Sequence, residues 1–248
     1  MNGRHLRTTL GDPFSNVALE EALFRKLRVP TLRTWNNQKS VIIGRAQLGE
    51  YETDIGYAKA NSIPVVRRFT AGGTVYNGPG NLNWSIFMPR NFQDRAADLR
   101  DVNQVFATFA GPVVEAIREC GAECAFNPPN SVVDKKGKVS GMAAYLSREA
   151  VLCHGTLLID ADLEEVERLT KPRDAELMGR YPRSKFTKVS NCGVDEGEFI
   201  SNLVLGLGFG LEPDELTASE AELARDLTRS KYSTDKWNFG DPFSLDDL

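Results

Sequence analysis

The feature that most constrains this chain is a run of small residues that directly follows two adjacent arginines, Arg67 and Arg68. Residues 67–83 read RRFTAGGTVYNGPGNLN. A glycine turn lets backbone N–H groups approach an anion closely, and guanidinium groups match phosphate oxygens. The segment lacks the ending of a P-loop and the glycine spacing of a dinucleotide site. It predicts a phosphate-binding strand–loop–strand; a hairpin turn with two surface arginines is the alternative that composition leaves open.

Size and composition allow one large domain, or one domain with a small appendage, and we expect a single catalytic-type domain over residues 1–248. The chain has 41% hydrophobic residues, which is enough for a substantial core. Its formal net charge of -4 gives no reason to expect nucleic acid binding. No apolar run approaches the roughly 20 residues that cross a bilayer, and the first residues lack a signal-peptide core. We therefore expect a cytoplasmic protein without a membrane partner.

The cysteines and histidines are too few and too scattered to predict a metal site or a disulfide framework. No C-x-x-C pair occurs, and the chain has only two histidines, His5 and His154. We expect reduced thiols and no structural metal. The cysteines are Cys120, Cys124, Cys153 and Cys192.

The order of the predicted elements indicates an α+β fold. Apolar spacing predicts helices over 15–27, 55–61, 101–120, 163–169, 194–207 and 218–230. Strands are predicted over 31–35, 40–44, 65–68, 81–88, 130–133, 138–144 and 150–159. The pair Asn36-Asn37 suits a hairpin or tight connection, and Gly111-Pro112 is expected to kink or divide its helix. Three successive short strands after residue 130 imply antiparallel pairing.

Several motifs in a fixed order give the chain a resemblance to lipoate-protein ligase A. They are the glycine run, Ser40–Gln47, Lys138-Val139-Ser140-Gly141, Val151–Asp160 with its His-Gly-Thr, and Lys231–Gly240. The resemblance covers about Asn16 to Gly240. It implies the fold of biotin protein ligases and class II aminoacyl-tRNA synthetases, a mixed and largely antiparallel sheet flanked by helices.

The resemblance implies a ligase that works through an acyl adenylate. Lipoate, ATP and Mg²⁺ would give lipoyl-AMP, and the lipoyl group would pass to a lysine of a lipoyl domain in a 2-oxoacid dehydrogenase complex or glycine cleavage H protein. Such a site must bring a carboxylate and a phosphate together, and fixed cations offset their repulsion. Whether lipoate or octanoate is preferred stays open.

The resemblance also assigns residues, with Lys138 as the catalytic cation between the lipoyl carboxylate and the α-phosphate. Without the motif, Lys138 would be read as a solvated lysine, and Trp35 or His154 as ordinary structural residues. The nucleotide residues are Arg68, Gly73, Thr74, Val75, Tyr76, Asn130 and Lys138. The lipoate residues are Leu19, Glu20, Trp35, Arg67, Gly72, Lys138 and His154.

The chain departs from the family pattern in four places. Ala71 replaces the first of three glycines, Asn77 replaces a histidine, and Ser131 replaces an aspartate after Asn130. The chain also stops at Leu248, where one-chain bacterial ligases continue into a C-terminal accessory domain. We therefore expect a small separate subunit to replace the missing domain.

Two other functions are kept as alternatives. One is an acyltransferase that carries an octanoyl or lipoyl group on a cysteine, for which Cys124 and Cys153 are the candidates, although buried small hydrophobes are the simpler interpretation of both. The other is a lipoyl-binding protein that does not form an adenylate. Ala71, Asn77 and Ser131 are the residues that favour it.

Overall fold

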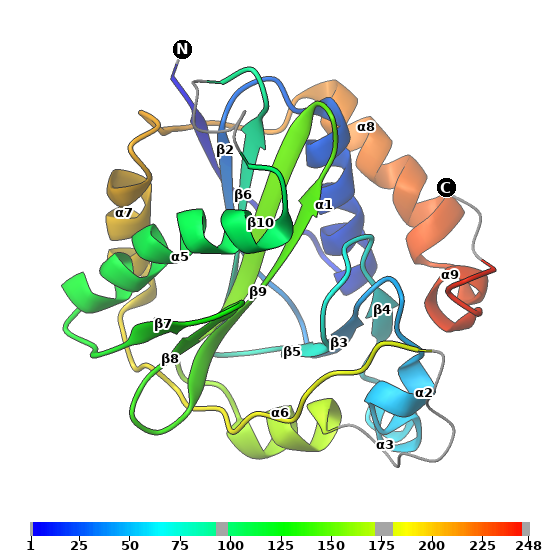
Figure 1. The fold of residues 1–248 in the computed structure, drawn as a ribbon. Coiled ribbons are helices and arrows are strands. Elements are labelled where there is room, and N and C mark those ends of the chain that lie inside the picture. The colour runs from blue at the N-terminus through cyan, green and yellow to red at the C-terminus, as the bar shows by residue number, and fades with distance from the viewer. Residues whose placement is uncertain (1, 93–98, 172–180, 245–248) are drawn as a thin grey trace.

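Two sheets form the centre of the protein, and the computed structural model describes them within residues 2–92, 99–171 and 181–244. The large sheet has the strand order β11-β1-β2-β6-β10-β9-β8-β7, and the small sheet has the order β4-β3-β5 (Figure 1). β1 pairs in parallel with β2 and β11, and the other pairs of the large sheet are antiparallel. The large-sheet strands are β1 (Arg4–Arg7), β2 (Thr31–Asn36), β6 (Asn81–Pro89), β7 (Ala125–Asn127), β8 (Ser131–Val133), β9 (Lys138–Leu146), β10 (Ala150–Leu158) and β11 (Glu212–Pro213). The small-sheet strands are β3 (Ser40–Ile43), β4 (Val65–Arg67) and β5 (Val75–Asn77).

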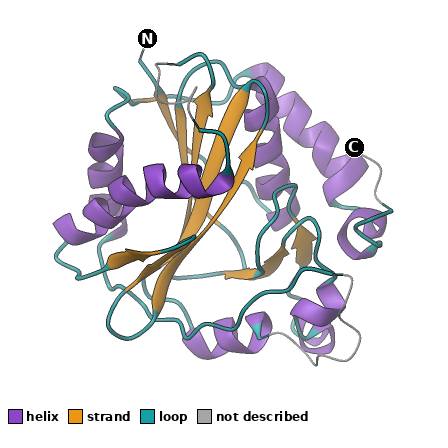
Figure 2. Ribbon diagram, in the orientation of Figure 1, coloured by secondary structure: helices purple, strands orange, loops and turns teal. Residues whose placement is uncertain are grey.

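Helices cover both faces of the large sheet (Figure 2). α5 and α7 pack with one face in a shared apolar core, and α1 and α8 pack with the other face. The small sheet has its own core with α3 and α6. The helices are α1 (Pro13–Lys26), α2 (Gly49–Glu52), α3 (Ile55–Ala60), α5 (Val102–Glu119), α6 (Leu163–Thr170), α7 (Glu196–Leu207), α8 (Ala218–Leu227), the π-helix Thr228–Tyr232 and α9 (Asp235–Phe239).

Strand β6 explains how polar groups come to line an interior face. Leu82, Trp84 and Ile86 alternate toward the core with α5 and α7. Because successive side chains point to opposite faces, Asn83 and Ser85 point toward α1. Both are buried, so this part of the sheet presents hydrogen-bonding groups inside the protein.

The structure confirms the predicted α+β class and the antiparallel pairing of 130–159, and it refines three local predictions. Of the two alternatives for Asn36-Asn37, the structure has the tight connection, from the end of β2 at Asn36 to the start of β3 at Ser40. It is not a hairpin, because β2 belongs to the large sheet and β3 to the small one. Gly111-Pro112 does not divide its helix: α5 is continuous through Pro112, because its buried apolar face offsets the missing hydrogen bond. α1 begins two residues earlier than predicted, because Asp12 accepts a hydrogen bond from the Ser15 N–H at 2.9 Å and caps it.

Candidate active site

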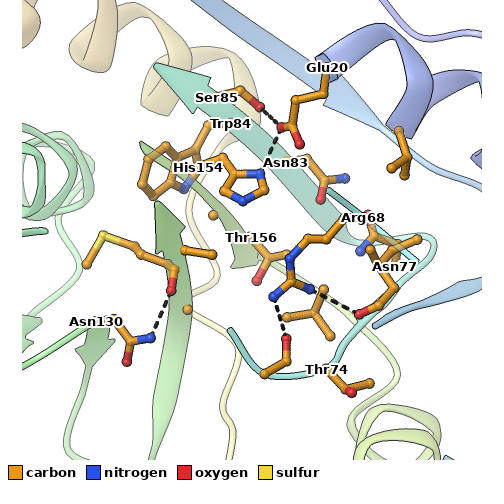
Figure 3. Close-up of a pocket in the computed structure, with 18 of the residues that line it drawn as sticks. Glu20, Arg68, Thr74, Asn77, Asn83, Trp84, Ser85, Asn130, His154 and Thr156 are labelled. Atoms are coloured by element: carbon orange, nitrogen blue, oxygen red, sulfur yellow. Dashed lines mark hydrogen bonds and ion pairs between the residues drawn. The ribbon is translucent and has the colours of Figure 1, made fainter. Parts of the chain in front are cut away.

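A cavity lies where α1, the large sheet and the glycine loop (residues 68–74) meet (Figure 3). Side chains from β2, β3, β5, β6, β9 and β10 complete its wall. Trp35, Ile42 and Met142 make part of that wall apolar. This mixture of polar and apolar lining residues suits a small molecule with a polar end. We call this space the first cavity.

The structure brings most of the predicted site residues to the first cavity, although they come from distant parts of the chain. Predicted residues on its wall are Glu20, Trp35, Arg68, Gly73, Thr74, Val75, Asn130, Lys138 and His154. Tyr76 lies instead on a second cavity, which shares Thr74, Val75, Lys138, Gly141 and Thr156 with the first.

Lys138 stands at the junction of the two cavities, at the first residue of β9. Its side chain lies across Gly141, and its Cε and Nζ are each 2.8 Å from the point that a Cβ at residue 141 would occupy. Burial lowers the pKa of the ammonium below its ordinary value. No hydrogen bond or ion pair to another described residue compensates that burial. The site therefore holds a desolvated cation that an anion would stabilise.

Arg68 organises the glycine loop from inside. Its Nη2 donates to the carbonyls of Ala71 at 2.9 Å and Gly73 at 2.8 Å, and its Nε donates to Thr70 Oγ1 at 2.9 Å. Its Nη1 donates to Ile42 O at 3.3 Å, which leaves one of its five N–H groups without a partner among the described residues. The guanidinium is thus a fixed positive charge at the wall of the first cavity. Burial lowers its pKa to about 10, so it stays protonated at neutral pH.

Gly72 is the loop position that needs glycine. Its φ of +105° lies in a region that side chains rarely adopt, and a Cβ there would come within 2.9 Å of Arg68 Nη2. Ala71 has no positive φ. Alanine in place of the first glycine therefore imposes no backbone strain on the loop.

A network of hydrogen bonds joins α1 to Arg68 through His154 and Thr70, and Figure 3 shows its links from Glu20 to Ser85 and to His154. Glu20 accepts from Ser85 Oγ at 2.6 Å and contacts His154 Nδ1 at 2.9 Å. His154 Nε2 lies 2.9 Å from Thr70 Oγ1, which also accepts from Arg68. These hydrogen bonds explain why a carboxylate can be buried at residue 20.

The pKa of Glu20 reflects that network. Burial raises it, but the charge and hydrogen bond of His154, the hydrogen bond from Ser85 and the charge of Arg33 outweigh burial. The result is a pKa below the usual value of a glutamate. The carboxylate therefore stays ionised inside the protein.

Three predicted lipoate residues do not lie on the wall of the first cavity. Leu19 is part of the apolar core between α1 and α8, and Gly72 lies behind Arg68 and Ala143. Arg67 is fully buried and donates to backbone carbonyls of the 45–47 turn and the C-terminal segment. Its acceptors are Arg45 O at 2.8 Å, Gln47 O, Trp237 O at 2.7 Å, Asn238 O at 3.3 Å and Gly240 O at 3.1 Å.

The second cavity has a polar edge that sequence reasoning missed. Ser184 Oγ accepts from the Thr74 N–H at 2.7 Å and from Gln47 Nε2 at 3.1 Å. Thr74 Oγ1 donates to Gln47 Oε1 at 3.0 Å, and the Tyr76 hydroxyl donates to Glu165 at 2.6 Å. Burial and the Glu165 carboxylate raise the pKa of Tyr76. These bonds fix the outer side of the glycine loop.

The cysteine chemistry considered from sequence finds no support in this geometry. Cys124 and Cys153 are buried in the core with α5 and do not line either cavity. Burial raises the pKa of Cys124 to about 11 and raises that of Cys153 further. An acyl-accepting thiolate needs the opposite shift.

Residues 2–92, 99–171 and 181–244 contain no group of three or more His, Cys, Asp or Glu side chains placed to hold a metal ion. Within the same ranges, no helix has the combined length and apolar character needed to cross a bilayer.

Comparison with known proteins finds similarity over most of the chain. Residues 12–193 match the family model of the lipoyl protein ligase A/B catalytic domain. Lipoate-protein ligase A subunit 1 of Thermoplasma acidophilum is 32% identical, and the match covers 97% of each protein. Lipoate-protein ligase LplJ of Bacillus subtilis is 29% identical over 93% of this chain and 71% of its own length.

Solved structures show the same architecture. A bi-partite lipoate protein ligase of T. acidophilum, studied with its E2 lipoyl domain, is 29% identical with a TM-score of 0.84, covering 100% of this chain and 99% of its own. A lipoate-protein ligase A bound with ATP is 29% identical with a TM-score of 0.83, covering 97% of this chain and 100% of its own.

Proposed function

This chain belongs to the lipoyl protein ligase A/B catalytic-domain family, and from that premise we propose that it activates lipoate with ATP and passes the lipoyl group to a lysine of a lipoyl domain. It is an ATP-dependent lipoate–protein ligase. The observation that carries the proposal is Lys138, a partly buried ammonium without a counter-charge among the described residues, at the junction of two cavities. A bound acid in one cavity and a nucleotide in the other would meet at this cation.

In the first step, a carboxylate oxygen of lipoate attacks the α-phosphorus of ATP. The new oxygen–phosphorus bond forms as the bond to the β-phosphate oxygen breaks, and pyrophosphate leaves. Both reactants are anions, so the barrier includes their repulsion. Lys138 lies where its charge would reduce that repulsion, and the fixed positive charge of Arg68 would act from the glycine loop.

In the second step, the ε-amine of the acceptor lysine attacks the acyl carbonyl carbon of lipoyl-AMP. The acyl–phosphate bond breaks, AMP leaves, and the amine loses a proton to solvent or to a base. Lys138 would stabilise the negative charge that develops on the departing phosphate. The acceptor is a lipoyl domain, as in the T. acidophilum system, whose structure was studied with its E2 lipoyl domain.

The remaining assignments follow the two cavities. Gly73, Thr74 and Val75 would lie along the nucleotide on the side of Tyr76, and Asn130 would close the far side of Lys138. Lipoate would occupy the first cavity between Glu20, Trp35 and His154. The walls of the two cavities, which include these residues, support the proposed assignments.

Magnesium is proposed to enter with ATP as a phosphate-bound ion. The described residues offer no protein-only cage, and Asn130 uses its side-chain amide to donate to Met142 O at 2.9 Å. Mg²⁺ commonly keeps several waters and binds mainly through substrate phosphates. Among the described residues, Lys138 and Arg68 would therefore supply the positive charge that the protein itself places near the phosphates.

A second, smaller subunit is proposed as a partner. Support comes from the near full-length match to subunit 1 of a T. acidophilum ligase and from the bi-partite ligase structure. Adenylation and transfer should both be measured with and without such a subunit. Residues 1–248 would then act as a single catalytic domain.

The direct test is formation of lipoyl-AMP and of lipoylated domain, followed by mass spectrometry. The reaction contains the chain, ATP, Mg²⁺, lipoate, the candidate small subunit and a lipoyl domain. Lys138→Ala should abolish adenylate formation and leave the circular dichroism spectrum unchanged. The matched control is Lys136→Ala, since Lys136 is an exposed lysine on the turn before β9.

Three outcomes would contradict the proposal. No adenylate from the wild-type chain with an authenticated partner would remove the ligase assignment. Binding of lipoate in calorimetry with no consumption of ATP under any partner condition would identify a non-adenylating binding protein. Full activity of Lys138→Ala would remove Lys138 from its role.

A further inference from the structure

Two carboxamide side chains on the wall of the first cavity have no hydrogen-bond partner among the described residues. Asn77 is 1% exposed and Asn83 is 5% exposed. The Asn77 Oδ1 and Asn83 Nδ2 atoms are shielded from solvent without a partner. Buried polar groups are normally paired, and leaving them unpaired is costly. Because both amides lie on the cavity wall, a polar group of a bound ligand can be their hydrogen-bond partner.

The strand register places Asn83 relative to Lys138. Gly141, which lies under Lys138, pairs with Thr156 across β9 and β10, and Thr156 pairs with Asn83 across β10 and β6. Trp35 on β2 pairs with Asn83, so Gly141, Thr156, Asn83 and Trp35 lie side by side on four neighbouring strands. Two strand spacings separate β9 from β6, about 10 Å, which is also about the length of an extended eight-carbon acid.

Asn77 approaches the same end of the cavity from the small sheet. It is the last residue of β5, and it belongs to the wall that also includes Ile42 of β3. In Figure 3, Asn77 and Asn83 lie on the side of Arg68 away from Asn130. The end of the cavity distant from Asn130 and β9 is therefore both apolar, through Trp35 and Ile42, and hydrogen-bonding.

We infer that Asn77 and Asn83 form a polar subsite for the distal end of the acyl chain, and that this subsite selects a sulfur-bearing acid over a plain alkyl acid of the same length. The inference rests on the proposed function, because it takes the carboxylate to lie at Lys138. The Asn83 N–H groups can donate to a disulfide sulfur of lipoate, a weak acceptor. Asn77 Oδ1 can accept from a thiol of the reduced acid. The methyl end of octanoate satisfies neither amide, so its binding leaves both unpaired.

The test is calorimetric binding of lipoate, dihydrolipoate and octanoate to the full chain. The wild-type protein should bind both sulfur-bearing acids at least fivefold more tightly than octanoate. Asn83→Leu and Asn77→Leu keep the side-chain size but remove the amide. Each should weaken lipoate binding and strengthen octanoate binding, so that the ratio of the two affinities falls at least threefold.

Asn103→Leu is the matched control, because Asn103 is exposed on α5 and should leave the ratio unchanged. Equal affinity of the wild-type chain for lipoate and octanoate would overturn the inference even if a leucine variant fails to fold. An unchanged ratio in both folded leucine variants would also overturn it, and would indicate that water serves the amides. If no acid binds at all, the proposed function itself fails.

Discussion

The ammonium of Lys138 occupies space that exists only because residue 141 is glycine, with Nζ 2.8 Å from the position of the absent Cβ. The spacing of Lys138, Ser140 and Gly141 thereby acquires a physical meaning. Lys138 is the first residue of β9, Gly141 leaves room three residues later, and the lysine side chain extends over Gly141 to the junction of the two cavities. The motif thus combines a lysine with the glycine that leaves space for its ammonium group.

Gly141→Ala should displace that cation without removing it. A methyl group at residue 141 would collide with Cε and Nζ, and the loss of one well-placed electrostatic group typically costs about 100-fold in rate. Lipoyl-AMP formation should fall by about that factor, measured by pyrophosphate release. Gly111→Ala on α5 is the control, since a Cβ there meets nothing within 4 Å. Full activity of Gly141→Ala would show that the ammonium is not held over this glycine.

Lipoate binding should weaken at alkaline pH earlier than an ordinary lysine would allow. Burial lowers the pKa of Lys138 below 10.5 in the free protein, and a bound carboxylate raises that pKa again. Affinity is therefore retained below the lowered pKa and falls as the pH rises through it, with proton uptake on binding in that window. Calorimetry in buffers of different ionisation enthalpy measures this uptake. Lys138→Ala should show none, and an unchanged uptake in that variant would assign the proton to another group.

The buried carboxylate of Glu20 should make folding stability depend on pH in the acid range. Its folded pKa is below the ordinary 4.5, so the unfolded chain binds more protons between the two values. Its contribution to the free energy of unfolding is present above pH 4.5 and is lost as the pH falls through the folded pKa. Urea unfolding across this range should give a flatter curve for Glu20→Gln than for the wild type. Parallel curves would mean that Glu20 titrates alike in both states.

Arg67→Met should destabilise the fold strongly, because it leaves backbone carbonyls from two segments without their donor. Losing the donor of a buried, charge-assisted network costs about 3 kcal/mol or more in the free energy of unfolding. Arg229→Met is the control: that side chain is 82% exposed and pairs with Asp226 on the surface. Its effect should stay within about 0.5 kcal/mol. Equal stability of the two variants would contradict the structural role given to Arg67.

The two neighbouring arginines show what sequence reasoning could and could not recover. In the sequence they look equivalent, and both were assigned to ligands. Adjacent residues at a strand end point in different directions, so Arg68 faces the first cavity and Arg67 the C-terminal segment. Strand alternation was a usable signal for separating them. The sequence gives no signal for the segment that Arg67 contacts, because that segment lies about 170 residues away along the chain.

The elements with strong local signals were predictable, and the marginal ones were not. α1 and β9 carry caps, periodicity or turn residues of their own. β1 and β11 were missed because they are short and gain their stability from parallel partners distant in sequence. Asn83 and Ser85 were missed for a related reason: β6 is buried on both faces, and the sequence does not reveal which face adjoins a cavity.

The five backbone acceptors of Arg67 also set a boundary for anyone who shortens or labels this protein. Trp237, Asn238 and Gly240 supply three of them, so in a version cut at residue 230 the arginine directly before the glycine loop would lose three of its five hydrogen-bond acceptors. Fluorescent tags, purification handles and fused domains belong after Gly240. A protease cut in the preceding segment would therefore loosen Arg67, the last residue of β4, directly beside the glycine loop.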